Sequence, residues 1–378
     1  MAPIPSQRHR FNMPRDVHYL NCAYMAPLSH EVSAAFADGA AYKSQPWTYR
    51  PADFFSYGET FRDRAASLAG TDADCIAIVP SVSYGMAIAA RNLPVRNGQQ
   101  IIVLSDQFPS NLYVWRERAA EMGADIITVQ RDQGAAWTDA VLAAIGNDTA
   151  IVAVPNCHWA DGGFVDLVKV GTACRAVGAA LVLDLTQSLG ALPFDIKDVQ
   201  PDFMVAACYK WLMGPYSLGM LYVAPKYHDG QPIEQGWINR AGSEDFSKLV
   251  DYRDDYQPGA RRFDMGERSN TPALMAASAA IDMLLDWGVD AIAATLAAKT
   301  QAIADAAQAI GLSASSLDIR ASHFLALGFP GDVPTGLTDK LAAENVFVSL
   351  RGPSLRVTPH VYNDDADGAK LIAVLARG

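Results

Sequence analysis

Between residues 75 and 223, short apolar runs alternate with longer segments that have helical spacing. The segments at 112–122 and 168–177 contain good helix formers, whereas the apolar runs have the length of buried strands. Because strands and helices alternate, we predict an α/β fold with a mainly parallel, seven-stranded sheet covered by helices on both faces. The strand candidates are 76–79, 100–104, 125–129, 150–154, 180–183, 203–206 and 218–223.

The pattern changes after residue 222, where Pro, Gly, Trp and charged residues form a long loop-like stretch. Residues 271–310 are rich in Ala and have helical spacing that is interrupted near Gly288. Strand-like pieces follow and predict a smaller α+β domain. We therefore predict an N-terminal segment that packs with the small domain, a large domain and a small C-terminal domain. Their ranges are 1–40, 41–260 and 261–378.

Composition argues against several classes of function. The chain has 378 residues, of which 50% are hydrophobic and 19% charged, as in soluble globular proteins. The formal net charge of −11 would repel a nucleic-acid backbone, so no nucleic-acid partner is expected. No run approaches about 18 consecutive apolar residues, and residues 1–19 lack an apolar signal-peptide core. The sequence therefore predicts a cytoplasmic protein without a membrane partner.

The cysteines do not indicate a metal site. Their number is odd and their spacing is unpaired, so neither a disulfide framework nor a zinc site is expected. They are Cys22, Cys75, Cys157, Cys174 and Cys208.

Two polar residues lie where apolar runs end. Asp184 ends the run at 180–183, and Lys210 follows the run at 203–206. Since ligands bind at strand ends in open α/β sheets, the two side chains predict a shared site. A buried lysine can form a Schiff base, and pyridoxal phosphate also needs a carboxylate beside its ring nitrogen. Gln187 could then reach the ring oxygen of the cofactor, whereas Lys210 taken alone could be an ordinary surface lysine.

A candidate phosphate site precedes a helical run. Ser81, Val82 and Ser83 lie between a strand candidate and that run, where backbone N–H groups and hydroxyls can hold a phosphate. The alternative is a serine that only caps the helix.

Two longer motifs point to a known family. Tyr19-Leu-Asn21-Cys-Ala opens the first motif, and the second reads Asp184-Leu-Thr-Gln187-Ser-Leu-Gly190. Over nearly its whole length the chain resembles the class V aminotransferase superfamily of fold-type I pyridoxal-phosphate enzymes, in particular its kynureninase-like and isopenicillin-N-epimerase-like branch. The resemblance implies that Asp184 pairs with the ring nitrogen, Gln187 with the ring oxygen, and that Lys210 forms the Schiff base.

The resemblance also implies further cofactor contacts. The turn at 81–83 aligns with the phosphate-holding turn of the family, and Phe108 falls where a ring stacks on the cofactor. Tyr209 and Trp237 are similar to residues of kynureninase-like members that contact the phosphate. For these two aromatics, a place in the hydrophobic core is the alternative.

Substrate contacts are implied in the same way. Arg356 resembles the arginine that holds the substrate α-carboxylate, although a surface ion pair is the alternative. Asn21 and His158 lie in segments where family members contact cofactor or substrate, and His158 could equally be a satisfied loop residue. Either Asn270 or Thr271 resembles the residue that reaches the phosphate of the neighbouring subunit, which implies a homodimer with shared active sites.

These residues predict a pyridoxal-phosphate-dependent enzyme that acts on a small amino acid, with transamination as the first choice. A lyase that cleaves C–S, C–Se or, like kynureninase, C–C bonds is an alternative, as is an epimerase. The loop at 349–355 has no cysteine, which argues against sulfur transfer through a persulfide. A non-catalytic nucleotide-binding protein is a remote alternative, because no glycine-rich phosphate loop follows a strand.

Overall fold

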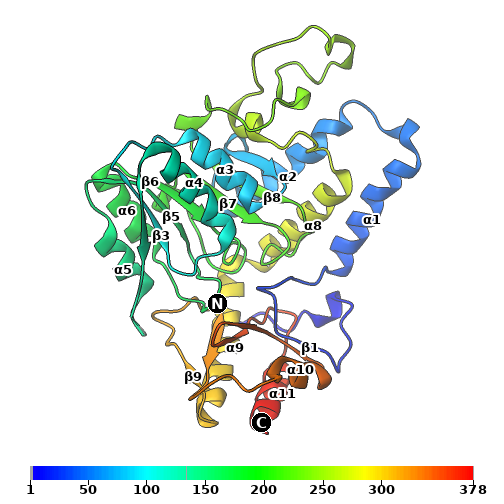
Figure 1. The fold of residues 1–378 in the computed structure, drawn as a ribbon. Helices are drawn as coiled ribbons and strands as arrows, with labels where there is room; N and C mark the ends of the chain where they lie inside the picture. The colour runs from blue at the N-terminus through cyan, green and yellow to red at the C-terminus, as the bar shows by residue number, and fades with distance from the viewer. Residues whose placement is uncertain (1–2, 133, 378) are drawn as a thin grey trace.

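A seven-stranded sheet forms the centre of the larger part of the molecule (Figure 1). The computed structural model describes residues 3–132 and 134–377. The strand order is β2-β8-β7-β6-β5-β3-β4, and only β8 runs antiparallel to its neighbours. The predicted mainly parallel sheet is therefore confirmed. The strands are β2 (Ile76–Val79), β3 (Gln100–Leu104), β4 (Asp125–Val129), β5 (Thr149–Pro155), β6 (Ala180–Asp184), β7 (Phe203–Ala207) and β8 (Gly219–Val223).

Both faces of the sheet are buried, because successive side chains of a strand point to opposite faces. In β2, Ile76 and Ile78 join one hydrophobic core, while Ala77 and Val79 join the other. One core is completed by α3 (Val82–Asn92) and α4 (Tyr113–Met122). The other core is completed mainly by α2 (Asp53–Ala69), α5 (Trp137–Ala144), α6 (Leu167–Val177), α7 (Ile196–Val199) and α8 (Thr271–Trp287).

Two long helices connect the sheet to the rest of the chain. The helical stretch predicted at 271–310 consists of α8 and α9 (Val289–Ala309), which meet at Gly288. Helix α8 packs on α2 and on α1 (His30–Ser44), and this contact is close because a Cβ on Gly39 would lie 2.6 Å from Cα of Pro272. Helix α8 follows residue 261 but packs on α1 and α2, which precede that residue. The domain boundary at residue 261 therefore stays a prediction.

The lower part of the molecule has a core of its own (Figure 1). Its antiparallel sheet has the order β12-β13-β10-β9, and α9 contributes Ile303 to the same core. A two-stranded parallel pair joins the N-terminal β1 (His18–Tyr19) to β11 (Val346–Phe347). The remaining elements are β9 (Ser313–Ala314), β10 (Leu325–Gly328), α10 (Leu337–Ala343), β12 (Ser349–Arg351), β13 (Ser354–Val357) and α11 (Asp365–Leu375).

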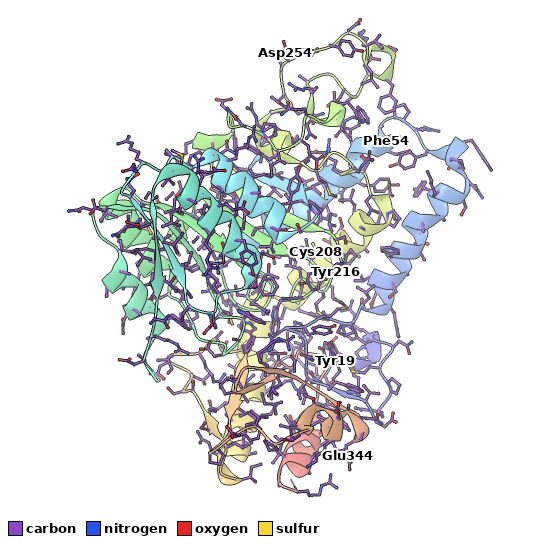
Figure 2. All side chains as sticks on the ribbon, viewed as in Figure 1. Tyr19, Phe54, Cys208, Tyr216, Asp254 and Glu344 are labelled. Carbon is purple, nitrogen blue, oxygen red and sulfur yellow. The ribbon has the colours of Figure 1, made fainter. Side chains whose placement is uncertain are left out.

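The loop-like stretch after β8 protrudes at the top of Figure 1, and Asp254 marks it in Figure 2. Short 3₁₀ turns interrupt it. In the described residues, no helix combines the length and apolar character needed to cross a membrane. The 3₁₀ turns of the chain are η1 (Arg8–Arg10), η2 (Pro46–Thr48), η3 (Ala73–Cys75), η4 (Pro109–Asn111), η5 (Pro225–Tyr227), η6 (Trp237–Asn239), η7 (Phe246–Lys248) and η8 (Gly259–Phe263).

Candidate active site

A cavity of about 320 Å³ lies at the carboxyl ends of β2, β5, β6 and β7. Strand ends that converge in an open α/β sheet are the usual place for a ligand. Figure 2 marks this region by Cys208 and Tyr216, near the middle of the molecule. Eight of the residues singled out in the sequence line the cavity together: Ser81, Val82, Ser83, Phe108, Asp184, Gln187, Tyr209 and Lys210.

Lys210 and Asp184 are both buried in this cavity. Burial lowers the pKa of Lys210 to about 8; the charge of Asp184 opposes this shift, and the charges of Arg356 and Arg351 reinforce it. Burial raises the pKa of Asp184, although hydrogen bonds from Thr186 and the charge of Lys210 oppose this. The lysine amine is therefore available as a nucleophile near neutral pH, with a carboxyl group close by.

Gln187 is held at both ends of its amide. Its Oε1 accepts a hydrogen bond of 2.9 Å from Nε1 of Trp211, and its Nε2 donates one of 3.1 Å to the carbonyl oxygen of Ala23. An amide nitrogen has two N–H groups. One of them is left to point at a ligand in the cavity.

The N-terminus of α3 faces the cavity. The Ser81 hydroxyl caps the helix by accepting from the N–H of Tyr84 at 3.2 Å, and it lies 3.0 Å from the Ser83 hydroxyl. Gly85 lets this turn approach the sheet, because a Cβ there would lie 2.8 Å from Val205. Free N–H groups and the helix dipole favour an anion at this place. The two hydroxyls add further donors, so the turn both caps the helix and can hold a phosphate.

An aromatic pair lines another side of the cavity. The rings of Phe108 and Trp159 meet edge to face at 5.3 Å, and Nζ of Lys210 lies 5.3 Å from the Phe108 ring centroid. The indole N–H of Trp159 donates to the carbonyl oxygen of Asp106 at 2.6 Å, in a loop where Asp106 has a φ of 52°. Because a left-handed conformation is unfavourable for a non-glycine residue, the surrounding contacts must hold this loop in place.

Arg356 is buried in β13, and like Asn21 it is not among the residues that line the cavity, although its charge lowers the pKa of Lys210. Its Nη2 donates to the Ser349 hydroxyl at 2.8 Å, and its Nη1 donates to the carbonyl oxygen of Trp159 at 2.8 Å. The Ser349 hydroxyl in turn donates to Oδ1 of Asn21 at 2.7 Å. No acidic side chain of the described residues pairs with Arg356, so the surface ion pair is not supported. Asn21 thus acts on this arginine through Ser349.

The His158 side chain does not line the cavity. Its ring stacks on Trp137 at 5.1 Å, its Nε2 lies 3.1 Å from the carbonyl oxygen of Ser105, and its Nδ1 lies 3.1 Å from Asp161. The next residue, Trp159, is the one that faces the cavity. Within this chain both ring nitrogens of His158 lie 3.1 Å from an oxygen, and the role of His158 toward a substrate stays a prediction.

Trp237, Asn270 and Thr271 lie away from this cavity in the same chain. Asn270 and Thr271 line a separate hollow, in which the Thr271 and Tyr49 hydroxyls are 2.8 Å apart. Trp237 is 42% exposed and meets the Phe54 ring edge to face at 6.2 Å. A contact of these residues with the cofactor of a neighbouring subunit stays a prediction.

Reasoning from the sequence missed Asn111, which also lines the cavity. Its Oδ1 accepts a hydrogen bond of 2.9 Å from Nε1 of Trp115, one helical turn away. Its Nδ2 is buried and has no partner among the described residues. A buried donor without a partner is costly, so it fits a site that a ligand with acceptor oxygens fills, such as pyridoxal phosphate.

The fold and the cavity define a class V enzyme of the fold-type I group. A sequence model of the family described as "Aminotransferase class-V" matches residues 47–352, and the chain belongs to this family. Its cofactor is pyridoxal 5'-phosphate. Family membership leaves no support for the alternative of a non-catalytic nucleotide-binding protein.

Two relatives show where the chain falls in the family. It is 26% identical to the uncharacterized aminotransferase YcbU of Bacillus subtilis (strain 168), over 96% of this chain and 95% of the relative. It is 27% identical to a kynureninase of Deinococcus radiodurans, over 80% of this chain and 73% of the relative. Transferase and lyase names thus occur among the similar proteins at nearly equal identity.

Solved structures agree on the fold. The cysteine desulfurase of Thermococcus onnurineus NA1 superposes with a TM-score of 0.87 at 18% identity, covering 100% of this chain and 99% of that chain. The cystine C–S lyase C-DES, in complex with cysteine persulfide, has a TM-score of 0.81 at 18% identity, covering 96% and 98%. These similarities confirm the fold-type I architecture and say nothing about the substrate.

Proposed function

We propose that this protein is a pyridoxal-phosphate-dependent enzyme that acts on a small amino acid, with transamination as its reaction. The observation that supports the cofactor chemistry is the pair of Lys210 and Asp184 at the ends of adjacent parallel strands, both buried in one cavity. Transamination is the first choice because it is the broadest assignment of the family. Burial lowers the pKa of Lys210 to about 8, so far more of its amine is neutral near physiological pH than for a lysine with the ordinary pKa of 10.5.

Each side chain has a distinct task in this proposal. Lys210 would hold the cofactor covalently, and its free amine would take the proton from the substrate α-carbon. Asp184 keeps the ring nitrogen protonated, and Gln187 donates to the ring oxygen. When bound, the cofactor withdraws electrons from the α-carbon. Phe108 and Trp159 cover one side of the cavity and exclude water from the reacting atoms.

The phosphate and the substrate carboxylate have separate holders. The N-terminus of α3, with Ser81 and Ser83, suits the phosphate, and Tyr209 lies in the same cavity. Arg356 uses three of its five N–H groups on Ser349 and Trp159, which leaves one N–H on each terminal nitrogen. Such a pair of donors suits a carboxylate.

A lyase is the second candidate, because the kynureninases among its relatives are as similar as the aminotransferase. Sulfur transfer through a surface persulfide is not supported. All five cysteines are buried, and the hairpin of β12 and β13 contains none.

A spectroscopic and product assay tests the proposal. Purified protein incubated with pyridoxal phosphate should gain a visible absorbance band that survives gel filtration, and the K210A variant should lack it. With a panel of amino acids, a transaminase forms at most about one keto acid per active site until a second keto acid is supplied, and it releases no ammonia. Without a second keto acid, sustained release of ammonia and a keto acid, or of alanine, would instead identify a lyase. Inversion at the α-carbon would identify an epimerase, and a colourless protein would refute the proposal.

We also propose that the enzyme is a cytoplasmic homodimer with shared active sites. The support is the position of Asn270, Thr271 and the exposed Trp237 outside the cavity of their own chain. Light scattering should give twice the mass of one chain. T271A and N270A should then weaken cofactor binding although neither residue lines the cavity of its own chain, and a monomeric protein would contradict this.

A further inference from the structure

A second arginine lies close to the arginine that is proposed to hold the α-carboxylate. In the hairpin of β12 and β13, Ser349 pairs with Arg356 and Arg351 pairs with Ser354. Residues that pair across strands, and residues two apart along a strand, share one face of a sheet. Arg351 and Arg356 are therefore diagonal neighbours on the same face, with backbones roughly 7–8 Å apart.

Both guanidinium groups reach the same residue of the cavity. The Cζ of Arg351 lies 5.8 Å from the ring centroid of Trp159, and the Cζ of Arg356 lies 5.7 Å from it. Trp159 lines the cavity and contacts Phe108, over which Nζ of Lys210 lies. The positive charge of Arg351 is also felt inside the site, because it lowers the pKa of Lys210 and of Arg356.

Neither arginine has an acidic partner within residues 3–132 and 134–377. The Nη1 of Arg351 donates to the carbonyl oxygen of Leu350 at 2.7 Å. The Arg351 side chain makes no other hydrogen bond within the described residues. Arg351 is half-buried and Arg356 is buried, and by contrast the buried Arg62 and Arg268 reach the carboxylate of Asp264. Two adjacent cations without a counter-ion repel each other, and a bound anion removes this cost.

We propose that the substrate is an amino acid with a second acidic group on its side chain. Its α-carboxylate binds Arg356, and its side-chain acid binds Arg351. A guanidinium presents a planar fork of donors that matches a carboxylate or a similar acid, so each acid group has a fitting partner. The inference rests on the proposed function, since it assigns a substrate class to the same site.

Pairs of amino acids that differ only in an acid or an amide on the side chain test this inference. Holoenzyme is titrated with aspartate and asparagine, and with glutamate and glutamine, using both enantiomers and the visible cofactor spectrum as the readout. Within each pair the two molecules have nearly the same shape and differ in charge. We expect the acidic member to bind at least about tenfold more tightly, because a charge-assisted hydrogen bond is lost with the amide.

Three variants separate the roles of the arginines. R351Q should abolish the preference for the acidic member while binding of the amide member changes less than about twofold. R356Q should weaken the binding of both members of each pair. R116Q is the control, because it removes the same charge from an exposed position outside the cavity, and it should keep the preference.

Equal affinity for the two members of every pair in the wild type would overturn the inference, and so would an R351Q variant that keeps the full preference. In both cases the visible band would still be present, so the proposed function would stand. Absence of the band in the wild type would overturn the proposed function and the inference with it.

Discussion

The indole of Trp211 determines which way the amide of Gln187 points. Nε1 of Trp211 donates to Oε1 of Gln187 at 2.9 Å, and the carbonyl oxygen of Ala23 accepts from Nε2 at 3.1 Å. An indole can only donate and a carbonyl can only accept, so the opposite orientation of the amide would lose both hydrogen bonds. Gln187, which lines the cavity, therefore has an N–H, and not an oxygen, left for a ligand there.

Replacing Trp211 by Phe should allow the amide of Gln187 to turn, because its Oε1 loses the indole donor. Buried Oε1 of Gln187 would lose its donor, and the free energy of unfolding should fall by about 1–3 kcal/mol in urea titrations of the apoprotein. The visible band of the holoprotein should also shift, because the donor to the ring oxygen is no longer held in place. Q187M, alone and combined with W211F, completes a double-mutant cycle. If the two changes are additive in stability and in spectrum, Trp211 does not act through Gln187.

The depressed pKa of Lys210 predicts a pH dependence of stability in the apoprotein. The folded chain gives up the lysine proton at about pH 8, whereas the ordinary pKa is 10.5, so the unfolded chain binds more protons between these values. Stability therefore rises with pH in this window, by about 1 kcal/mol per pH unit at most. Urea titrations of the wild type and of K210M from about pH 7.5 to about 9.5 isolate the contribution of Lys210 to the pH dependence of stability. A pH-independent difference between the two proteins would contradict the depressed pKa.

Removing the Ser83 hydroxyl should weaken binding of the phosphate group specifically. We expect S83A to bind pyridoxal phosphate about tenfold more weakly, because a hydrogen bond to a charged group is lost. Pyridoxal, which lacks the phosphate, should bind S83A and wild type equally in absorbance titrations. Ser110 lines the same cavity but belongs to η4 and not to the first turn of α3, so S110A is the control. An equal loss for both ligands would place Ser83 away from the phosphate.

Asn111 offers a second test of how the cofactor is held. N111D keeps an oxygen to accept from Nε1 of Trp115 but replaces the unpartnered Nδ2 by a second oxygen. A buried carboxylate would repel the anionic cofactor, and we expect at least about a tenfold loss of affinity. Thermal unfolding of the apoprotein serves to show that the variant folds. Unchanged affinity in a folded variant would mean that Asn111 does not face the cofactor.

Much of the fold was predictable, because strands buried on both faces leave continuous apolar runs in the sequence. The candidate strand at 203–206 differs from β7 by one residue, and the break near Gly288 separates α8 from α9. The convergence of Asp184 and Lys210 was predictable as well. Asp184 ends β6 and Lys210 follows β7, and because these strands are adjacent and parallel, both side chains reach the same edge of the sheet.

Other parts of the site carry no comparable signal. His158 and Trp159 are neighbours in one loop, yet only Trp159 faces the cavity, because the His158 ring stacks on Trp137. The unpartnered nitrogen of Asn111 depends on Trp115 occupying the other end of the amide. Side-chain orientation of this kind follows from packing and hydrogen bonding, which residue spacing does not specify.

The sequence by itself determined the fold class, the family and the cofactor. Periodic burial and the residues around Asp184 and Lys210 are local features that a chain carries before it folds. Only the tertiary structure decided the orientation of Gln187, the depressed pKa of Lys210 and the adjacent, unpaired charges of Arg351 and Arg356. These properties depend on burial and on distances between segments far apart in the chain, because the energy of a charge or a polar group is set by the atoms that replace water around it.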